Sequence, residues 1–214
     1  MEKKESSKKE SRQEEVLLHE SKEAQMIGTK ISARDMKARW TWSELTSPRF
    51  AKKIAGHGAD AVRLQDFAQN GGKFADVSDA DKDILAAIAE KRQPGFLDAV
   101  KGVKEFVCEE WTKQDLLDTM VIPALSPKKD HNIPYSDFIK NPPYMVGGKP
   151  EWSDPRHSAE SWPQGKAFTQ DEPAVAMNYP GTSKKMLLDG YGRSVIFMRY
   201  GKDNDRFLVW MPAQ

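Results

Sequence analysis

Cysteine is nearly absent from this chain of 214 residues, which contains only Cys108. A single cysteine cannot form an intramolecular disulfide or build a cysteine-based zinc site. Cys108 follows Phe106 and Val107 in a short apolar run, and burial in such surroundings raises the pKa of a thiol. We therefore expect a buried, unreactive thiol. The lack of cysteine pairs also suits a reducing compartment.

Long apolar runs are lacking as well. No stretch approaches the roughly 20 apolar residues that a membrane span requires. The lysine-rich N-terminus is not followed by the apolar core of a secretory signal. We therefore expect no membrane partner, and the cytoplasm is the expected location.

The chain also lacks an excess of charge of one sign. Lys and Arg number 33 against 32 Asp and Glu, which leaves a formal net charge of +1. A chain this balanced has no general attraction to nucleic acid, so nucleic-acid binding would need a local basic patch. The candidate is the basic stretch from Lys30 to Arg39, which ends at Trp40 and Trp42. These tryptophans would either stack on bases or, as is more common, dock an extension onto its own domain.

What the chain does contain divides it into three parts. Residues 1–42 form a polar, basic N-terminal extension, and residues 43–125 show apolar spacings near 3.6 residues broken by Gly and Pro. This second pattern predicts small amphipathic helices packed in a bundle. One helix is expected from Phe96 through Val107, and Thr112 and Asp115 resemble a capping box that opens the next.

Residues 126–214 form the third part, in which a Pro-rich segment precedes a strongly apolar end. Prolines at this density exclude long helices and central strands, whereas the aromatic residues among them argue against disorder. We expect this segment, up to Thr182, to wrap over a core and line a site. Residues 184–188 and 206–212 are short, mainly apolar and bounded by turn residues, which predicts two strands.

The block between these strands has two interpretations. It is either the middle strand of an antiparallel meander, or a glycine turn followed by a short helix from Arg193 to Tyr200 that Gly201 ends. Periodicity alone slightly favours the meander. A helix here would have to be buried on nearly all sides, because Ile196, Phe197 and Met198 are consecutive large apolar residues.

The run from Met186 to Ser194 resembles the signature of the ParB/sulfiredoxin-like superfamily. In that signature an apolar strand enters an Asp-Gly or Gly-rich turn, and an Arg, a helix and another strand follow. The resemblance covers residues 133–212 and favours the helical interpretation. The Gly-x-x-Arg turn of this family binds nucleotide phosphate. Its members include CTP-hydrolysing partition proteins, ATP-using sulfinic acid reductases, and small-molecule or protein kinases.

The resemblance implies a phosphate site at the turn, and elementary chemistry agrees with it. Glycines let backbone N–H groups approach an anion, the helix N-terminus adds unpaired donors, and an arginine adds a forked cation. Asp189, at the end of the strand, would orient the ligand or a metal-bound water. The implied phosphate contacts are Gly190, Tyr191, Gly192, Arg193 and Ser194.

An upstream family motif, Asn-Pro-x-Arg, has its best match at Ser153–His157, with Asp154 in place of Asn and Arg156 directly after Pro155. If the match holds, Arg156 is a second phosphate contact, and Asp154 or His157 is an acid–base group. Gly192 stands where the sulfiredoxins have cysteine, which excludes their reductase chemistry. Only 21 residues follow Arg193, so we do not expect the DNA-reading domain that follows the signature in partition proteins.

The sequence therefore predicts an α+β fold: an N-terminal helical bundle and a C-terminal domain with a small mixed sheet wrapped by the Pro-rich loop. The leading hypothesis is a nucleotide- or phosphate-ester-binding protein that uses ATP or CTP with Mg²⁺, with phosphoryl transfer or hydrolysis as its activity. The rival hypotheses are a non-catalytic protein-interaction module and a nucleic-acid accessory protein. His131 and His157 have no partner at metal-ligand spacing, so we expect no metal–histidine site.

Overall fold

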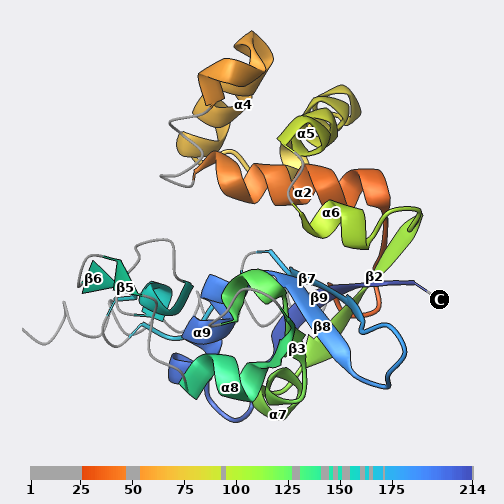
Figure 1. The fold of residues 1–214 in the computed structure, drawn as a ribbon. Helices are drawn as coiled ribbons and strands as arrows, with labels where there is room; N and C mark the ends of the chain where they lie inside the picture. The colour runs from red at the N-terminus through yellow and green to blue at the C-terminus, as the bar shows by residue number, and fades with distance from the viewer. Residues whose placement is uncertain are drawn as a thin grey trace, which may run out of the picture.

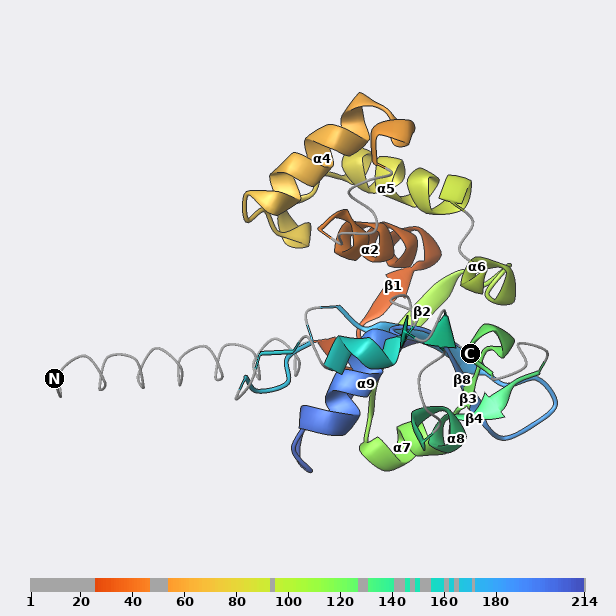
Figure 2. The ribbon, with the colours of Figure 1, turned by 60° about the vertical axis from the view of Figure 1, so that its left-hand side comes forward.

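Helices cover both faces of a mixed sheet in this protein (Figures 1 and 2). The computed structural model describes residues 26–46, 54–92, 95–126, 131–140, 145–146, 149–150, 155–159, 162–163, 166–170 and 172–213. Expectations for residues 1–25 and for the gaps between these ranges lie outside the described residues. The α+β class expected from the sequence is confirmed.

The main sheet has seven strands in the order β1-β2-β9-β7-β8-β3-β4. These are β1 (Lys30–Ser32), β2 (Glu105–Trp111), β3 (Met120–Val121), β4 (Ile133–Pro134), β7 (Ala174–Asn178), β8 (Lys185–Asp189) and β9 (Phe207–Pro212). Strand β9 pairs antiparallel with β2 and parallel with β7. A separate two-stranded sheet contains β5 (Met145–Val146) and β6 (Lys149–Pro150). The predicted strands at 184–188 and 206–212 are confirmed as β8 and β9.

The helices form layers above and below the main sheet. They are α2 (Ala33–Leu45), α4 (Ala59–Gln69), α5 (Asp79–Arg92), α6 (Phe96–Ala99), α7 (Lys113–Leu117), α8 (Tyr135–Lys140) and α9 (Tyr191–Tyr200), with 3₁₀ segments η1 (Ile54–His57), η2 (Phe74–Asp76), η3 (Pro123–Leu125) and η4 (Pro155–Ala159). Helices α2 and α6 cover one face, and α4 and α5 pack outside α2 (Figure 1). Helices α7, α8 and α9 cover the other face (Figure 2). No helix in the described part of the chain has the length and apolar character needed to cross a membrane.

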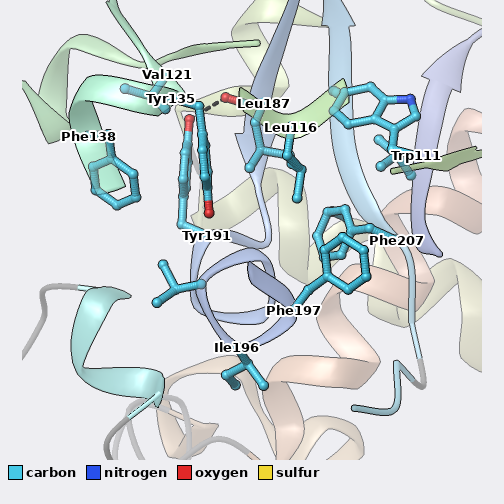
Figure 3. Close-up of a cluster of buried hydrophobic side chains, with 14 of the residues drawn as sticks. Trp111, Leu116, Val121, Tyr135, Phe138, Leu187, Tyr191, Ile196, Phe197 and Phe207 are labelled. Atoms are coloured by element: carbon cyan, nitrogen blue, oxygen red, sulfur yellow. Dashed lines mark hydrogen bonds between the residues drawn. The ribbon is translucent and has the colours of Figure 1, made fainter. Parts of the chain in front are cut away.

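Within the described residues, three clusters of buried side chains hold these layers together. One fills the space between the sheet and α7–α9, and includes Tyr191, Phe197 and Phe207 (Figure 3). A second lies between the sheet and α2–α6, and the third lies among α2, α4 and α5. Because both faces of the sheet are covered, Phe207–Met211 are all buried, as expected for a central strand.

The helix expected from Phe96 through Val107 is wrong in its second half. Helix α6 ends at Ala99, and β2 begins at Glu105 after a turn in which Gly102 has a φ of +86°. Phe106 belongs to the cluster beneath α2, whereas Val107 packs against the cluster beneath α9. Apolar residues on both faces of this strand hide the alternation that normally identifies a strand.

The basic stretch from Lys30 to Arg39 is not an extended arm. It forms β1 and most of α2, so the helical region begins at Ala33 rather than at the expected Ser43. Trp40 packs edge-on against Phe96, with ring centroids 5.4 Å apart, and Trp42 packs against the rings of α4 and η2. The tryptophans therefore dock α2 within the helical layers, as in the second interpretation of the sequence.

Two local predictions are confirmed in the strand-and-turn region. Thr112 and Asp115 form a reciprocal capping box at the start of α7. Cys108 is buried, and this burial raises the pKa of its thiol to about 12.

Gln170 takes the place of a strand residue beside β9. Its Oε1 accepts a hydrogen bond from the backbone N–H of Leu208 at 2.8 Å, and its Nε2 donates to the carbonyl oxygen of Leu208 at 2.8 Å. Both residues are buried. The side-chain amide thus satisfies two buried backbone groups that would otherwise lack partners.

The thiol of Cys108 is expected to resist modification in the folded protein. At pH 8, a pKa near 12 instead of 9.0 lowers the thiolate fraction about a thousandfold. We expect a disulfide reagent such as DTNB to react at least that much more slowly with the native chain than with the chain unfolded in urea. Equal rates in the two states would show that the thiol is accessible.

Replacing the amide of Gln170 is expected to destabilise the fold. Gln170→Ala leaves both backbone groups of Leu208 buried without partners, so the free energy of unfolding should fall by about 2–3 kcal/mol, as measured by urea denaturation. Gln114→Ala is the control, because Gln114 bonds only to the exposed Asp118 on the same helix turn, and its cost should be about 0.5 kcal/mol or less. Equal losses in the two variants would contradict the role given to Gln170.

Candidate functional site

The turn between β8 and α9 is the region that the sequence singled out, and Gly190 shapes it. Asp189 ends the strand, Gly190 takes a left-handed conformation (φ +90°, ψ +17°), and α9 begins at Tyr191. A Cβ atom on Gly190 would lie 2.5 Å from the Cβ of Ala174 in β7. Glycine is thus required here both by the backbone angle and by the close approach of β7.

The segment after this turn is a helix, so the meander interpretation is wrong. Val195, Ile196 and Phe197 are all buried, because the sheet lies on one side of α9 and η4 packs against it as well. This is the burial on nearly all sides that the helical interpretation required. Gly201 does end the helix, but in an extended conformation rather than a left-handed one. A Cβ atom there would lie 2.6 Å from the carbonyl oxygen of Phe197.

The side chains of Tyr191 and Ser194, two of the predicted phosphate contacts, lie in the core. The hydroxyl of Tyr191 donates to the carbonyl oxygen of Leu187 (Figure 3) and accepts from the backbone N–H of Ile122 at 3.1 Å. Ser194 Oγ accepts from the hydroxyl of Tyr135 at 2.8 Å. Burial raises the pKa of both phenols above the ordinary value. These side chains anchor α9. The backbone N–H of Ser194 already donates to the carbonyl oxygen of Gly190 at 2.9 Å, so of these two residues only the backbone N–H of Tyr191 remains a candidate for ligand contact.

Arg193 folds back over the turn and contacts Asp189. Its Nη2 lies 3.3 Å from Asp189 Oδ2, and the two side chains are 27% and 34% exposed. The same Nη2 is 3.2 Å from the position that a Cβ on Gly190 would occupy. A cation near a helix N-terminus is disfavoured by the helix dipole. The first turn of α9 holds no acidic residue, so Asp189 supplies the compensating charge.

A small crevice lies where this turn meets α2. Arg193 lines it together with Arg39 and Ser43 of α2, Glu172 just before β7, and Trp210 of β9. Its volume of about 10 Å³ holds roughly one water molecule. Arg39 Nη1 donates to Glu172 Oε1 at 3.2 Å across the crevice.

Arg156, the predicted second phosphate contact, is held by α8. It is buried in η4, where its Nη1 donates to the carbonyl oxygen of Phe138 at 3.3 Å and its guanidinium lies 5.1 Å from the centroid of the Phe138 ring. These contacts tie Arg156 to α8. Asp154 lies outside the described residues, as does the side chain of His157. The structure thus brings together Asp189, Gly190, Gly192 and Arg193.

A cavity of about 300 Å³ lies between α2, α6 and β2. Its described lining residues include none of the predicted site residues. Among the described residues, no three His, Cys, Asp or Glu side chains converge as a metal site would require. Any Mg²⁺ at the β8–α9 turn would therefore depend mainly on oxygens of the ligand, with Asp189 as the carboxylate beside it.

Nothing in the sequence indicates that Arg39, Glu172 and Trp210 belong to this region. Arg39 belonged to a general run of basic residues, Glu172 to the Pro-rich segment, and Trp210 to a strand whose residues are all apolar. Arg39 and Glu172 are 133 positions apart. No local pattern indicates such a pairing.

The backbone of Gly190 is expected to be sensitive to a single methyl group. Gly181 offers a matched control, because it has a φ of +73° but nothing within 4 Å of a Cβ atom. Gly181→Ala should cost about 1–2 kcal/mol of unfolding free energy from the backbone angle alone. Gly190→Ala should cost about 2 kcal/mol more, because its methyl group also overlaps Ala174. Chemical denaturation measures both, and equal costs would show that the approach of β7 is not tight.

Comparisons with known proteins leave the family open: no family model, no curated protein and no solved structure matches this chain. The resemblance to the ParB/sulfiredoxin-like superfamily therefore stays a prediction. The function has to be argued from the geometry of the turn.

Proposed function

We propose that the chain binds a nucleotide or another phosphate ester at the turn between β8 and α9. The backbone N–H groups in the first turn of α9 and the guanidinium of Arg193 are the proposed anion contacts. The observation that carries the proposal is the combination of a left-handed Gly190, a helix N-terminus with no side-chain cap, and an arginine folded over that end.

Electrostatics supports an anion at this place. The unpaired N–H groups and the dipole of a helix N-terminus both favour negative charge, and Arg193 adds a cation that the same dipole disfavours. The contact of Arg193 with Asp189 is 3.3 Å long, whereas strong charge-assisted bonds are about 2.7–2.9 Å long. A phosphate group can therefore compete for the guanidinium. The resemblance of residues 186–194 to a phosphate-binding signature supports the same assignment.

The available space limits how a ligand can bind. The crevice of about 10 Å³ beside Arg193 is far smaller than the roughly 300 Å³ or more typical of ligand pockets. As it stands, the crevice could take no more than one phosphate oxygen. Gly192 and Arg193 are both partly exposed, so the rest of the ligand would lie on the outer side of the turn.

We further propose that phosphoryl transfer or hydrolysis takes place at this turn. If the ligand is ATP or CTP, Mg²⁺ bound to its phosphates would neutralise charge during phosphoryl transfer or hydrolysis. Asp189 would orient the attacking group, and Arg193 would hold the phosphate. The phenols of Tyr191 and Tyr135 take no part in acid–base steps near neutral pH, because burial raises their pKa values.

Ligand-induced stabilisation tests the proposal. Thermal unfolding is measured for wild type and Arg193→Ala with ATP, CTP, GTP and ADP, each with and without Mg²⁺. One of these nucleotides should stabilise wild type by about 2.7 kcal/mol at 100 times its dissociation constant. Arg193→Ala should fold but lose this stabilisation.

Arg199→Ala is the matched control, because Arg199 lies in the last turn of the same helix and is exposed. It should keep the full stabilisation. If no nucleotide stabilises wild type, or if both arginine variants respond alike, the β8–α9 turn is a structural element and the phosphate-site proposal falls.

A further inference from the structure

The crevice beside Arg193 contains a second arginine held by an internal carboxylate. Arg39 of α2 and Glu172 form an ion pair whose side chains are 28% and 14% exposed. Arg193 and Asp189 form a second such pair beside it, so the charges of these four described residues balance. An external anion therefore gains little from these arginines while Glu172 stays in place.

The crevice also contains hydrogen-bond donors without acceptors. Trp210 is 2% exposed, and its indole Nε1 has no hydrogen-bond partner among the residues that the structure describes. The same holds, within those residues, for Nε of Arg39. Buried donors nearly always have a partner. These two donors line the crevice together with the carboxylate of Glu172, so a group bound there would have to accept hydrogen bonds from Trp210 and Arg39. The volume of about 10 Å³ accommodates a single oxygen-sized group.

Arg39 keeps its place independently of Glu172. Its guanidinium lies 4.4 Å from the centroid of the Phe74 ring in η2, and such stacking orients an arginine without any carboxylate. Removing the charge of Glu172 would therefore leave a positioned cation beside Arg193. It would not leave a freely moving side chain.

We infer that Arg39 is the second cation of the phosphate site, that Trp210 Nε1 donates to an oxygen of the bound anion in the crevice, and that the carboxylate of Glu172 holds Arg39 until the ligand displaces it. The inference rests on the proposed function of the β8–α9 turn and adds its regulation. Glu172 competes with the ligand for Arg39, and this competition raises the concentration of phosphate ligand that is needed for binding.

A charge-removing variant of the competitor tests this inference. Inorganic pyrophosphate is titrated by calorimetry at fixed ionic strength into wild type, Glu172→Gln and the control Glu44→Gln. Glu44 is a suitable control because it also pairs with an arginine, Arg92, at 3.4 Å and is similarly shielded. Glu172→Gln should bind pyrophosphate about tenfold more tightly than wild type, and Glu44→Gln should not differ from wild type.

A second measurement uses the folded wild type itself and does not depend on the stability of Glu172→Gln. The indole N–H resonance of Trp210 is assigned by its disappearance in Trp210→Phe. This resonance should shift when pyrophosphate is added to wild type, because the bound anion becomes its hydrogen-bond acceptor. In an Arg193→Ala background the shift should be lost.

The outcomes separate this inference from the proposed function. If pyrophosphate binds in an Arg193-dependent way, but Glu172→Gln matches Glu44→Gln and the Trp210 resonance stays in place, the inference is wrong and the phosphate site stands. If binding does not depend on Arg193, the proposed function fails, whatever Glu172 does. If neither wild type nor Glu172→Gln binds pyrophosphate or any of the four nucleotides, both are overturned.

Discussion

The contact between Gly190 and Ala174 is the constraint on which the C-terminal half of the structure depends. Because β7 approaches within 2.5 Å of the place where a side chain would start, the chain can leave β8 only through a glycine in a left-handed turn. That turn decides where α9 begins. It thereby decides that Tyr191 reaches back to Leu187 and Ile122, and that Arg193 lies over the strand end.

Strand β9 links the region around α9 to the helices on the other face of the sheet. It lies between β2 and β7, and its alternate side chains enter two different cores. Phe207 and Val209 pack beneath α9, whereas Leu208 and Trp210 pack beneath α2. One strand therefore fixes the distance between the α9 turn and the helical layer that carries Arg39. The crevice lined by both arginines is a product of this spacing.

The features that the sequence predicts correctly are those that depend on residues close together in the chain. The capping box at Thr112, the strands at both ends of the glycine run and the burial of Cys108 all follow from neighbouring residues. Strand β2 was mistaken for helix because it places apolar side chains on both faces. Residues 194–200 have strand-forming side chains, and only the packing of η4 and the sheet around them makes a helix the better solution.

The residues of the candidate site also differ in whether neighbouring residues in the sequence reveal them. Asp189, Gly190 and Arg193 are contiguous, so their shared position was predictable from one motif. Arg39, Glu172 and Trp210 come from three separate elements, and their meeting depends on the order of strands in the sheet. No spacing rule connects them. A motif match assigns Arg156 to the same site, and in the structure its guanidinium packs on the ring of Phe138 in α8.

The strand order has a consequence for the way the chain reaches its native state. Strand β9 separates β1-β2 from β7-β8-β3-β4, yet it follows all of them in the sequence. During synthesis the two halves of the sheet cannot join until β9 has emerged, whereas α2, α4 and α5 lie within one early stretch and can pack as soon as it is made. The side of α2 that faces the sheet can pack against Phe96 and Phe106 early, but its contacts with Leu208 and Trp210 form only after every other strand of the main sheet has been made.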